Sequence, residues 1–191
     1  MTDFSEQVVK KTLIDDLYII ERPVFKDDRG LFKEVVRFGS LSKDINFDFK
    51  PSQWSHSISK KGVLRGIHAE SWNKIVYPVT GKVFLAQVDI RPESRTFGKY
   101  ETLISDEDNR FALYVTKGIA NSFCVMGEED VHYLYVVDGS YDGSDTKAIA
   151  WDDPDVAVPW PVKNPIISDR DKGNPRLRDM FPDKFTPTPK G

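Results

Sequence analysis

The sequence predicts an all-β fold of the sandwich, barrel or jelly-roll type, and two observations support this prediction. Its apolar segments are short, and turn residues separate them. No long window carries apolar residues at the spacing of an amphipathic helix. Many short strands at close spacing are typical of these three architectures.

The earlier strands are expected where β-branched and aromatic residues gather. Such runs occupy residues 17–25 (LYIIERPVF) and 74–79 (KIVYPV). Between them, residues 38–45 (FGSLSKDI) are the one stretch that suggests a short helix. In residues 82–91 (KVFLAQVDIR), alternate positions share a face, so one face carries Phe84, Ala86, Val88 and Ile90. That apolar face is expected to lie in the core.

The later strands are expected at residues 99–105 (KYETLIS), 111–116 (FALYVT), 121–126 (NSFCVM), 131–137 (VHYLYVV) and 147–151 (KAIAW). Gly118 stands between two of them, where glycine can supply the positive φ of a turn. In the segment 131–137, Tyr133 and Tyr135 share one face. Because each buried hydroxyl needs a hydrogen-bond partner, this pair suits the wall of a cavity as readily as a packed core.

The length of the chain suits a single domain. We expect one domain over residues 1–191, because a chain of this size can bury a sizeable core. From about residue 151 the sequence changes character, since WDDPDVAVPWPVKNP is dense in proline. Proline cannot donate a backbone hydrogen bond, so this C-terminal part is expected to run as an extended segment over the surface.

The charge balance and composition limit the partners. The formal net charge is −3, and nucleic acids and anionic membranes are bound by proteins with a basic excess, so neither is expected as a partner. The single cysteine, Cys124, excludes an internal disulfide. The polar start MTDFSEQVVKKTLIDD and the lack of an apolar run of about 20 residues predict a cytoplasmic protein.

Metal, nucleophilic and nucleotide-loop chemistry all lack their usual signatures. His56, His68 and His132 stand singly, and Glu70 is the one carboxylate close to His68 on the same face, so no metal site is expected. The sequence contains no Gly-x-Ser-x-Gly elbow, no phosphate-binding loop and no Gly-x-Gly-x-x-Gly. Acid–base chemistry is the class that remains.

The segment KKGVLRGIHAESWNK (60–74) holds Arg65, His68 and Lys74, while Tyr135 and the stretch SDRD (168–171) offer a phenol and carboxylates. A histidine can abstract a proton, a lysine can stabilise an enolate, a tyrosine can deliver a proton, and an aspartate can fix the imidazole tautomer. The residues alone also allow a purely structural interpretation, which is the simpler one. In it, His68 ends a strand, Tyr135 belongs to the core and Asp171 lies on the surface.

Taken in order, blocks of the sequence resemble the dTDP-4-dehydrorhamnose 3,5-epimerase family. The resemblance runs from about Val24 to Asp171 through FKDDRGLFKE, SISKKGVLRGIH, NKIVYPVTGKVF, VDIRPESRTFGKY, TKGIANSF, YLYVVDGSY, AWDDPDVAVPWP and ISDRD. Each block alone is a weak signal, whereas so many in order make a strong one. The resemblance implies a cupin-type jelly roll with short peripheral helices, with no metal or other cofactor, and typically a homodimer.

The resemblance also implies roles for individual residues. His68 matches the general base, Asp171 the carboxylate paired with it, Tyr135 the general acid, and Lys74 the residue next to the 4-keto oxygen. The substrate-binding positions that it implies are Arg29 and Arg65 at the phosphates, Tyr141 as a second active-site tyrosine, and Glu34 and Asn121. The implied activity is epimerisation of a nucleotide-diphosphate 4-keto-6-deoxy sugar at C3, C5 or both, by proton abstraction and reprotonation from the opposite face.

The departures from the family pattern surround the implied pocket. Asn121 replaces a histidine, Ala69 and Glu70 replace the aromatic residue and glutamine that commonly follow the base, and Leu85 stands where an aspartate is common. The loop that leads to Lys74 is shortened. Similar changes occur in the branch that acts on GDP-4-keto-6-deoxy-heptoses, so guanosine is an alternative to thymidine. The further alternatives are a catalytically lapsed sugar-nucleotide-binding cupin, a metal-dependent cupin and a 3,4-ketoisomerase.

Overall fold

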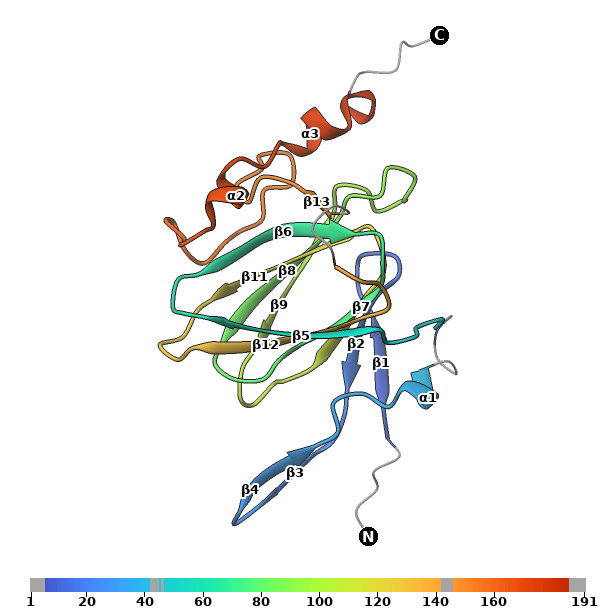
Figure 1. Ribbon diagram of the computed structural model, residues 1–191, viewed down its shortest axis with the longest axis vertical. Coiled ribbons are helices and arrows are strands. Elements are labelled where there is room, and N and C mark those ends of the chain that lie inside the picture. Colours follow the sequence, from blue (N-terminus) through green and yellow to red (C-terminus); the bar gives the residue numbers. More distant parts are fainter. Residues whose placement is uncertain (1–5, 42–44, 46, 142–145, 186–191) are drawn as a thin grey trace.

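The computed structural model describes residues 6–41, 45, 47–141 and 146–185, and antiparallel strands are its main regular secondary structure (Figure 1). Two large sheets form the body, and a two-stranded hairpin projects away from them. This architecture confirms the predicted all-β jelly roll with short peripheral helices. None of the described helices is long and apolar enough to cross a membrane.

The sheets bring together strands that are far apart in the sequence. The six-stranded sheet has the order β1 (Val8–Lys11), β2 (Leu17–Glu21), β10 (Ala112–Val115), β7 (Lys74–Pro78), β12 (Val131–Val137) and β5 (Gln53–Ser59). The five-stranded sheet has the order β13 (Thr146–Ala148), β6 (Leu64–Glu70), β11 (Ile119–Val125), β8 (Val83–Asp89) and β9 (Tyr100–Ser105). The hairpin is β3 (Val24–Asp27) and β4 (Gly30–Lys33), and the helices are α1 (Phe38–Leu41), α2 (Asp169–Lys172), α3 (Leu177–Met180) and η1 (Pro182–Lys184).

Most expected strands are present, with two corrections. The expected strand 17–25 is two strands, β2 and β3, because Pro23 lies between them and has no N–H for a ladder. The expected strand 147–151 ends at Ala148, and Trp151 lies in a turn. The expected helix is present as α1, and residues 42–44 of that stretch lie outside the described residues.

Strands β1, β4, β5 and β6 were not among the expected strands, and the surroundings of β5 explain why that strand was missed. Its outward side chains include the apolar Trp54 and Ile58, which are 72% and 52% exposed. Its inward positions carry the polar Gln53, Ser55 and Ser57, which line a cavity. The usual pattern of apolar inside and polar outside is therefore inverted along this strand.

The core fills the space between the two sheets. Leu85, Phe123 and Tyr133 are completely buried there, and the rings of Phe123 and Tyr133 stack with their centroids 4.3 Å apart. On the other face of β8, Val88 and Ile90 are also buried, as expected. The C-terminal segment covers that face, since Val156 and Leu177 join the same cluster. Both faces of β8 are thus core.

Asp89, at the end of β8, is the centre of a buried polar cluster. Its carboxylate accepts hydrogen bonds from Ser94 and Thr96, both at 2.6 Å, and from the guanidinium of Arg91 at 2.8 and 2.9 Å. Arg91 also donates to the carboxylate of Asp16 at 3.0 Å. The cluster therefore ties the connection between β8 and β9 to the connection between β1 and β2.

Candidate active site

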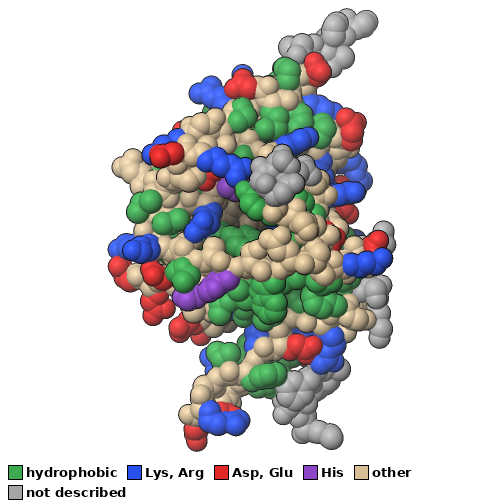
Figure 2. Space-filling model, viewed as in Figure 1, with side chains coloured by type: hydrophobic (Ala, Val, Ile, Leu, Met, Phe, Trp, Pro, Cys, Tyr) green, Lys and Arg blue, Asp and Glu red, His purple; other side chains and the backbone are tan. Residues whose placement is uncertain are grey.

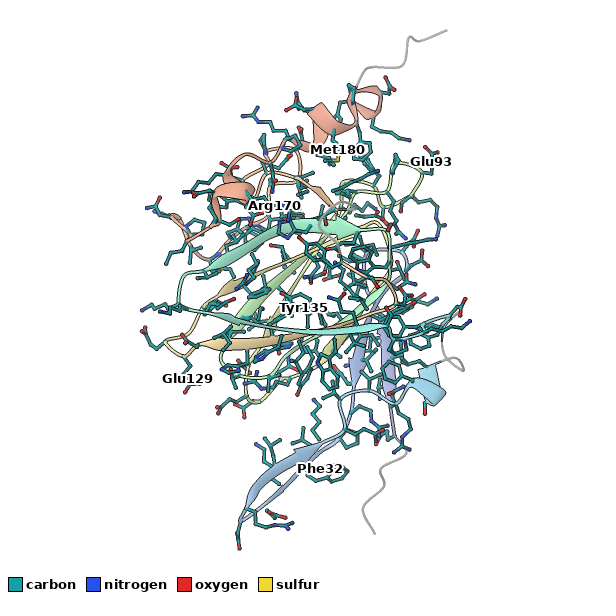
Figure 3. All side chains as sticks on the ribbon, viewed as in Figure 1. Phe32, Glu93, Glu129, Tyr135, Arg170 and Met180 are labelled. Carbon is teal, nitrogen blue, oxygen red and sulfur yellow. The ribbon has the colours of Figure 1, made fainter. Side chains whose placement is uncertain are left out.

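A cavity of about 600 Å³ opens between the two sheets beside α2. Figure 2 shows this face of the molecule hollowed in the region between β5 and β6. Figure 3 places Tyr135 between the ribbons of these two strands and Arg170 at α2. Side chains of β5, β6, β7, β11, β12 and α2 line the cavity, so both sheets and the C-terminal segment build it.

His68 and Asp171 form a hydrogen-bonded pair in this cavity. The Nε2 atom of His68 lies 2.6 Å from Oδ1 of Asp171, although the two residues are 103 positions apart. The side chain of His68 is 26% exposed and that of Asp171 is 6% exposed. The imidazole is therefore open to the cavity while its carboxylate partner is buried. The interpretation that Asp171 lies on the surface is wrong.

The C-terminal segment brings Asp171 to β6 through backbone contacts. Ile166 forms an isolated parallel bridge with Val63, and its carbonyl accepts a hydrogen bond from the backbone N–H of Leu64 at 3.0 Å. Two residues later, Ser168 caps α2, and its hydroxyl accepts from the backbone N–H of Asp171 at 3.1 Å. The contacts of Ile166 with the start of β6 and the cap at Ser168 together fix where the carboxylate of Asp171 lies.

The electrostatics of Asp171 favour a carboxylate. Burial alone raises the pKa of Asp171, but hydrogen bonds from His68, Ser168 and the backbone N–H of Gly66 and the charge of His68 outweigh it, and the pKa lies below its ordinary value. An ionised carboxylate orients the imidazole and stabilises the imidazolium that forms when the other ring nitrogen accepts a proton. The pair has the geometry of a general base with its orienting group.

Lys74 begins β7 and reaches the same cavity. The residue is 3% exposed, and its ammonium forms an ion pair with the carboxylate of Glu70 at the end of β6. Burial lowers the pKa of Lys74, while the charge and hydrogen bond of Glu70 raise it, and the lowering prevails. A buried cation at the cavity wall can stabilise a developing enolate oxygen.

Tyr135 supplies a phenol to the cavity from β12. Its hydroxyl lies 3.5 Å from that of Ser57 on β5, and its ring packs against Tyr133 with centroids 5.0 Å apart. Burial raises the pKa of Tyr135, so the phenol keeps its proton. A protonated phenol on the sheet opposite His68 is suited to donate a proton to the other face of a bound substrate.

Asn121 lies on β11, paired in register with His68. It is 7% exposed, and its Oδ1 accepts hydrogen bonds from Gln87 Nε2 at 3.1 Å and from the hydroxyl of Tyr133 at 3.4 Å. These bonds hold its side-chain oxygen toward the core. Its amide group remains as a donor at the cavity wall.

The mouth of the cavity carries two arginines and two aromatic rings. Arg65 is fixed by hydrogen bonds to the hydroxyl of Ser59 at 2.8 Å and the carbonyl of Ile58 at 3.0 Å. Arg170 on α2 donates to the hydroxyl of Tyr141 at 3.1 Å, and Trp72 meets the ring of Tyr141 edge to face. Such a rim suits a ligand with anionic groups and a flat ring.

Arg29 and Glu34 lie away from this cavity in the single chain. Arg29 is at the turn of the β3–β4 hairpin, where its guanidinium binds Asp27 at 2.6 Å. Glu34 follows the hairpin and forms ion pairs with Arg22 and Arg37. The resemblance implies nine site positions, and the structure leaves these two outside the cavity. It brings together the other seven, which are Arg65, His68, Lys74, Asn121, Tyr135, Tyr141 and Asp171.

Sequence reasoning did not assign roles to Glu70, Trp72 and Arg170, which also line the cavity. Trp72 and Glu70 stand in the segment AESWN, whose departure from the family pattern was a usable signal. Arg170 had a weaker one, because it adjoins Asp171 in the block ISDRD. Within the described part of the chain, no group of three or more His, Cys, Asp or Glu side chains is arranged to hold a metal ion.

Comparison with known proteins gives a consistent result. The family model of dTDP-4-dehydrorhamnose 3,5-epimerase matches residues 11–179. The dTDP-4-dehydrorhamnose 3,5-epimerase of Shigella flexneri is 35% identical over 175 residues, which are 90% of this chain and 96% of the relative.

Two solved structures extend the likeness to the fold. The Legionella pneumophila dTDP-6-deoxy-D-glucose-3,5-epimerase in complex with dTDP-4-keto-L-rhamnose has a TM-score of 0.85 and 29% identity, covering 97% of this chain and 100% of that one. ChmJ, a 3'-monoepimerase from Streptomyces bikiniensis in complex with dTDP-quinovose, has a TM-score of 0.84 and 28% identity, covering 93% and 91%. The chain belongs to the dTDP-4-dehydrorhamnose 3,5-epimerase family.

Proposed function

We propose that this enzyme epimerises a dTDP-linked 4-keto-6-deoxy sugar at C3, C5 or both. The observation that carries the proposal is the His68–Asp171 pair at 2.6 Å, which faces a cavity that also holds the phenol of Tyr135 and the ammonium of Lys74. Relatives of the same family bind dTDP-linked sugars, which supports thymidine over guanosine.

The reaction needs each of these groups for a separate reason. A C–H bond next to a ketone is acidic only when the resulting enolate is stabilised, and Lys74 supplies the positive charge beside the C4 oxygen. His68, oriented by Asp171, removes the proton from C3 or C5. Tyr135 then delivers a proton to the opposite face of the same carbon, which inverts it.

The rim of the cavity supports binding of the nucleotide portion. Arg65 is held in place by two hydrogen bonds and offers its planar guanidinium to the diphosphate, and Arg170 lies at the same opening. The aromatic pair of Trp72 and Tyr141 provides a surface for a base or a sugar ring. Asn121 offers an amide donor inside the cavity.

Incubation with dTDP-4-keto-6-deoxy-glucose in deuterated water tests the proposal. We expect deuterium at C3, C5 or both, detected by NMR and mass spectrometry, with product formation. The His68→Asn variant should lose exchange, because it lacks the base, whereas Tyr135→Phe should keep exchange and lose inversion, because it lacks the acid. If the wild-type enzyme exchanges only with a GDP-linked 4-keto sugar, the thymidine assignment is overturned.

A binding-only role makes a different prediction in the same experiment. A lapsed sugar-nucleotide-binding protein would bind dTDP with no exchange at any carbon, and His68→Asn would bind it equally well. A 3,4-ketoisomerase would move the carbonyl, which product NMR detects. A cytoplasmic location remains a prediction from the sequence, and cell fractionation tests it.

We also propose that the enzyme is a homodimer. The β3–β4 hairpin projects from the body (Figure 1) and exposes Leu31 and Val24, at 63% and 44%. An isolated two-stranded hairpin is marginally stable in water, so a second chain packed on it would supply the missing burial. Arg29 and Glu34 lie on or next to this hairpin, so a role for them at the substrate requires the cavity of the second chain.

A further inference from the structure

Lys74 has a single charged partner in the described part of the chain. Its ammonium is buried at the cavity wall, and among the described residues Glu70 alone forms an ion pair with it. The side chains are 4% and 14% exposed, so water screens the pair weakly. The pair joins the end of β6 in one sheet to the start of β7 in the other.

The short loop between β6 and β7 fixes the geometry of this pair. Asn73, just before Lys74, is held by two hydrogen bonds: its backbone N–H and its side-chain amide both donate to the carboxylate of Asp138, at 2.8 and 2.7 Å. On the other side, the carbonyl of Glu70 accepts from the backbone N–H of Gly118 at 2.9 Å. Both ends of the loop are therefore held by the fold, independently of the ion pair itself.

We propose that Glu70 is the positioning residue of Lys74. The carboxylate of Glu70 holds the ammonium of Lys74 at the cavity wall and keeps it protonated for the reaction. This inference rests on the proposed function, because it assigns a task to the charge on Lys74. It also gives a physical meaning to the departure at this position, since a glutamine, which is common there in the family, could hold the ammonium by a hydrogen bond without supplying a negative charge.

The charge matters because the lysine is desolvated. Burial lowers the pKa of Lys74, and the charge and hydrogen bond of Glu70 are what oppose this lowering. Without that carboxylate the ammonium would lose its proton at a lower pH, and a neutral amine stabilises an enolate far less well. Glu70 therefore extends the activity toward alkaline pH.

Other titratable groups share the cavity and have to be separated from this effect. The strands next to β7 present Val115 and Val137 to Lys74, which do not titrate. The titratable and charged groups on the cavity walls are Arg65, His68, Tyr135, Tyr141, Arg170 and Asp171. Of these, Tyr135 could be confused with Lys74 in a pH profile. Burial is the main cause of its raised pKa, and the charge of Glu70 raises that pKa further.

A titration of Lys74 without substrate tests the inference directly. The chain is labelled with ¹³Cε-lysine, and the Lys74 resonance is assigned by its absence in Lys74→Arg. We expect the Glu70→Gln variant to show a pKa of Lys74 lower by at least about one unit, and Glu70→Asp to stay close to the wild type because it keeps the charge. The Glu128→Gln variant, which removes a carboxylate from an exposed ion pair with Lys61, is the control and should change nothing.

Exchange kinetics then test the consequence for the reaction. Exchange at C3 and C5 is measured against pH in a Tyr135→Phe background, which removes the titration of the phenol. In Glu70→Gln, the alkaline decline of the pH–rate profile should move to lower pH by about the same amount as the lysine pKa in the NMR titration. The exchange rate on the plateau should change less than the position of this decline, and KM should be nearly unchanged. A lysine pKa that is equal in wild type and Glu70→Gln overturns the inference even if the enzyme is active. If the wild-type enzyme shows no exchange at C3 or C5 while the pKa of Lys74 still depends on Glu70, the proposed function is overturned instead.

Discussion

Gly66 is the residue on which the position of Asp171 depends most closely. A Cβ atom built at Gly66 would lie 2.7 Å from Cγ of Asp171 and 2.9 Å from its Oδ2. The backbone of Gly66 has no positive φ, so the glycine is required for space and not for conformation. The aspartate can approach the backbone of β6 and accept the N–H of Gly66 only because no side chain intervenes.

The Gly66→Ala substitution should therefore inactivate the enzyme without unfolding it. The added methyl group displaces the carboxylate from His68, and a misplacement of about 1 Å in such a site costs about 10²-fold in kcat. Steady-state kinetics and thermal unfolding measure the two effects. The control is Gly39→Ala, since a Cβ atom there has nothing within 4 Å. A Gly66→Ala enzyme with full activity would show that the His68–Asp171 pair is dispensable.

At this scale, the sequence allowed the types of reactive residue to be named but not their pairing. His68, Tyr135 and Asp171 gave a plausible acid–base set, but 103 positions separate the histidine from its carboxylate, and no local pattern predicts such a contact. The resemblance to a family supplied the pairing. Glu70 was visible only as a carboxylate near His68, and its contact with Lys74 depends on the bend between two sheets.

Among the elements, the connection between β8 and β9 is held by the buried carboxylate of Asp89. Burial alone raises the pKa of Asp89, but hydrogen bonds from Arg91, Ser94 and Thr96 outweigh it, and the pKa lies below its ordinary value. A carboxyl group whose pKa is lowered by folding stabilises the folded state above its unfolded pKa of about 3.9. That contribution is lost as the pH falls through the lower, folded-state pKa.

Asp89→Asn should lower the free energy of unfolding at pH 7 by about 3 kcal/mol, because it removes the buried carboxylate that pairs with Arg91 and leaves the guanidinium, among the described residues, with only the exposed Asp16 as a charged partner. The difference from the wild type should narrow as the pH falls below about 4. Urea unfolding at pH 7, 5 and 3.5, at one fixed protein concentration, measures it. Asp130→Asn, at an exposed aspartate, should leave stability unchanged. An equal loss at all three pH values would contradict the role of the charge.

The strands whose positions could be predicted from the sequence were those with at least one apolar face in the core. Strands β7 to β12 have apolar inward faces, and their positions follow from the sequence to within a few residues. Strand β5 was not predicted, because its inward face is polar and lines the cavity. Helix α2 has only four residues and depends on the cap of Ser168, so it carries no periodic signal.

For the molecule as a whole, the hairpin is the feature that a single chain leaves incomplete. If two chains pack through it, a charge at Leu31 should prevent association, because a buried carboxylate without a partner is costly. Leu31→Asp should run as a monomer in sedimentation and light scattering, while the wild type runs as a dimer. Figure 3 shows the neighbouring Phe32 on this hairpin, remote from Tyr135 in the cavity.

The chain offers a matched control for that experiment. Leu13 is 73% exposed and lies between β1 and β2, away from the hairpin, so Leu13→Asp makes the same chemical change at another exposed leucine. It should leave the association unchanged. A wild-type chain that is monomeric at all concentrations, or a Leu31→Asp chain that remains dimeric, would contradict the proposed assembly.

The C-terminal origin of Asp171 has a consequence for synthesis of the chain. The ribosome releases β5, β6, β7 and β12 long before α2, and domains begin to fold as they emerge. The two sheets can therefore pair while the imidazole of His68 still has no carboxylate to orient it. Proton abstraction becomes competent only after Asp171 has left the ribosome, so chains that terminate between β12 and α2 are expected to carry the β framework without its reactivity.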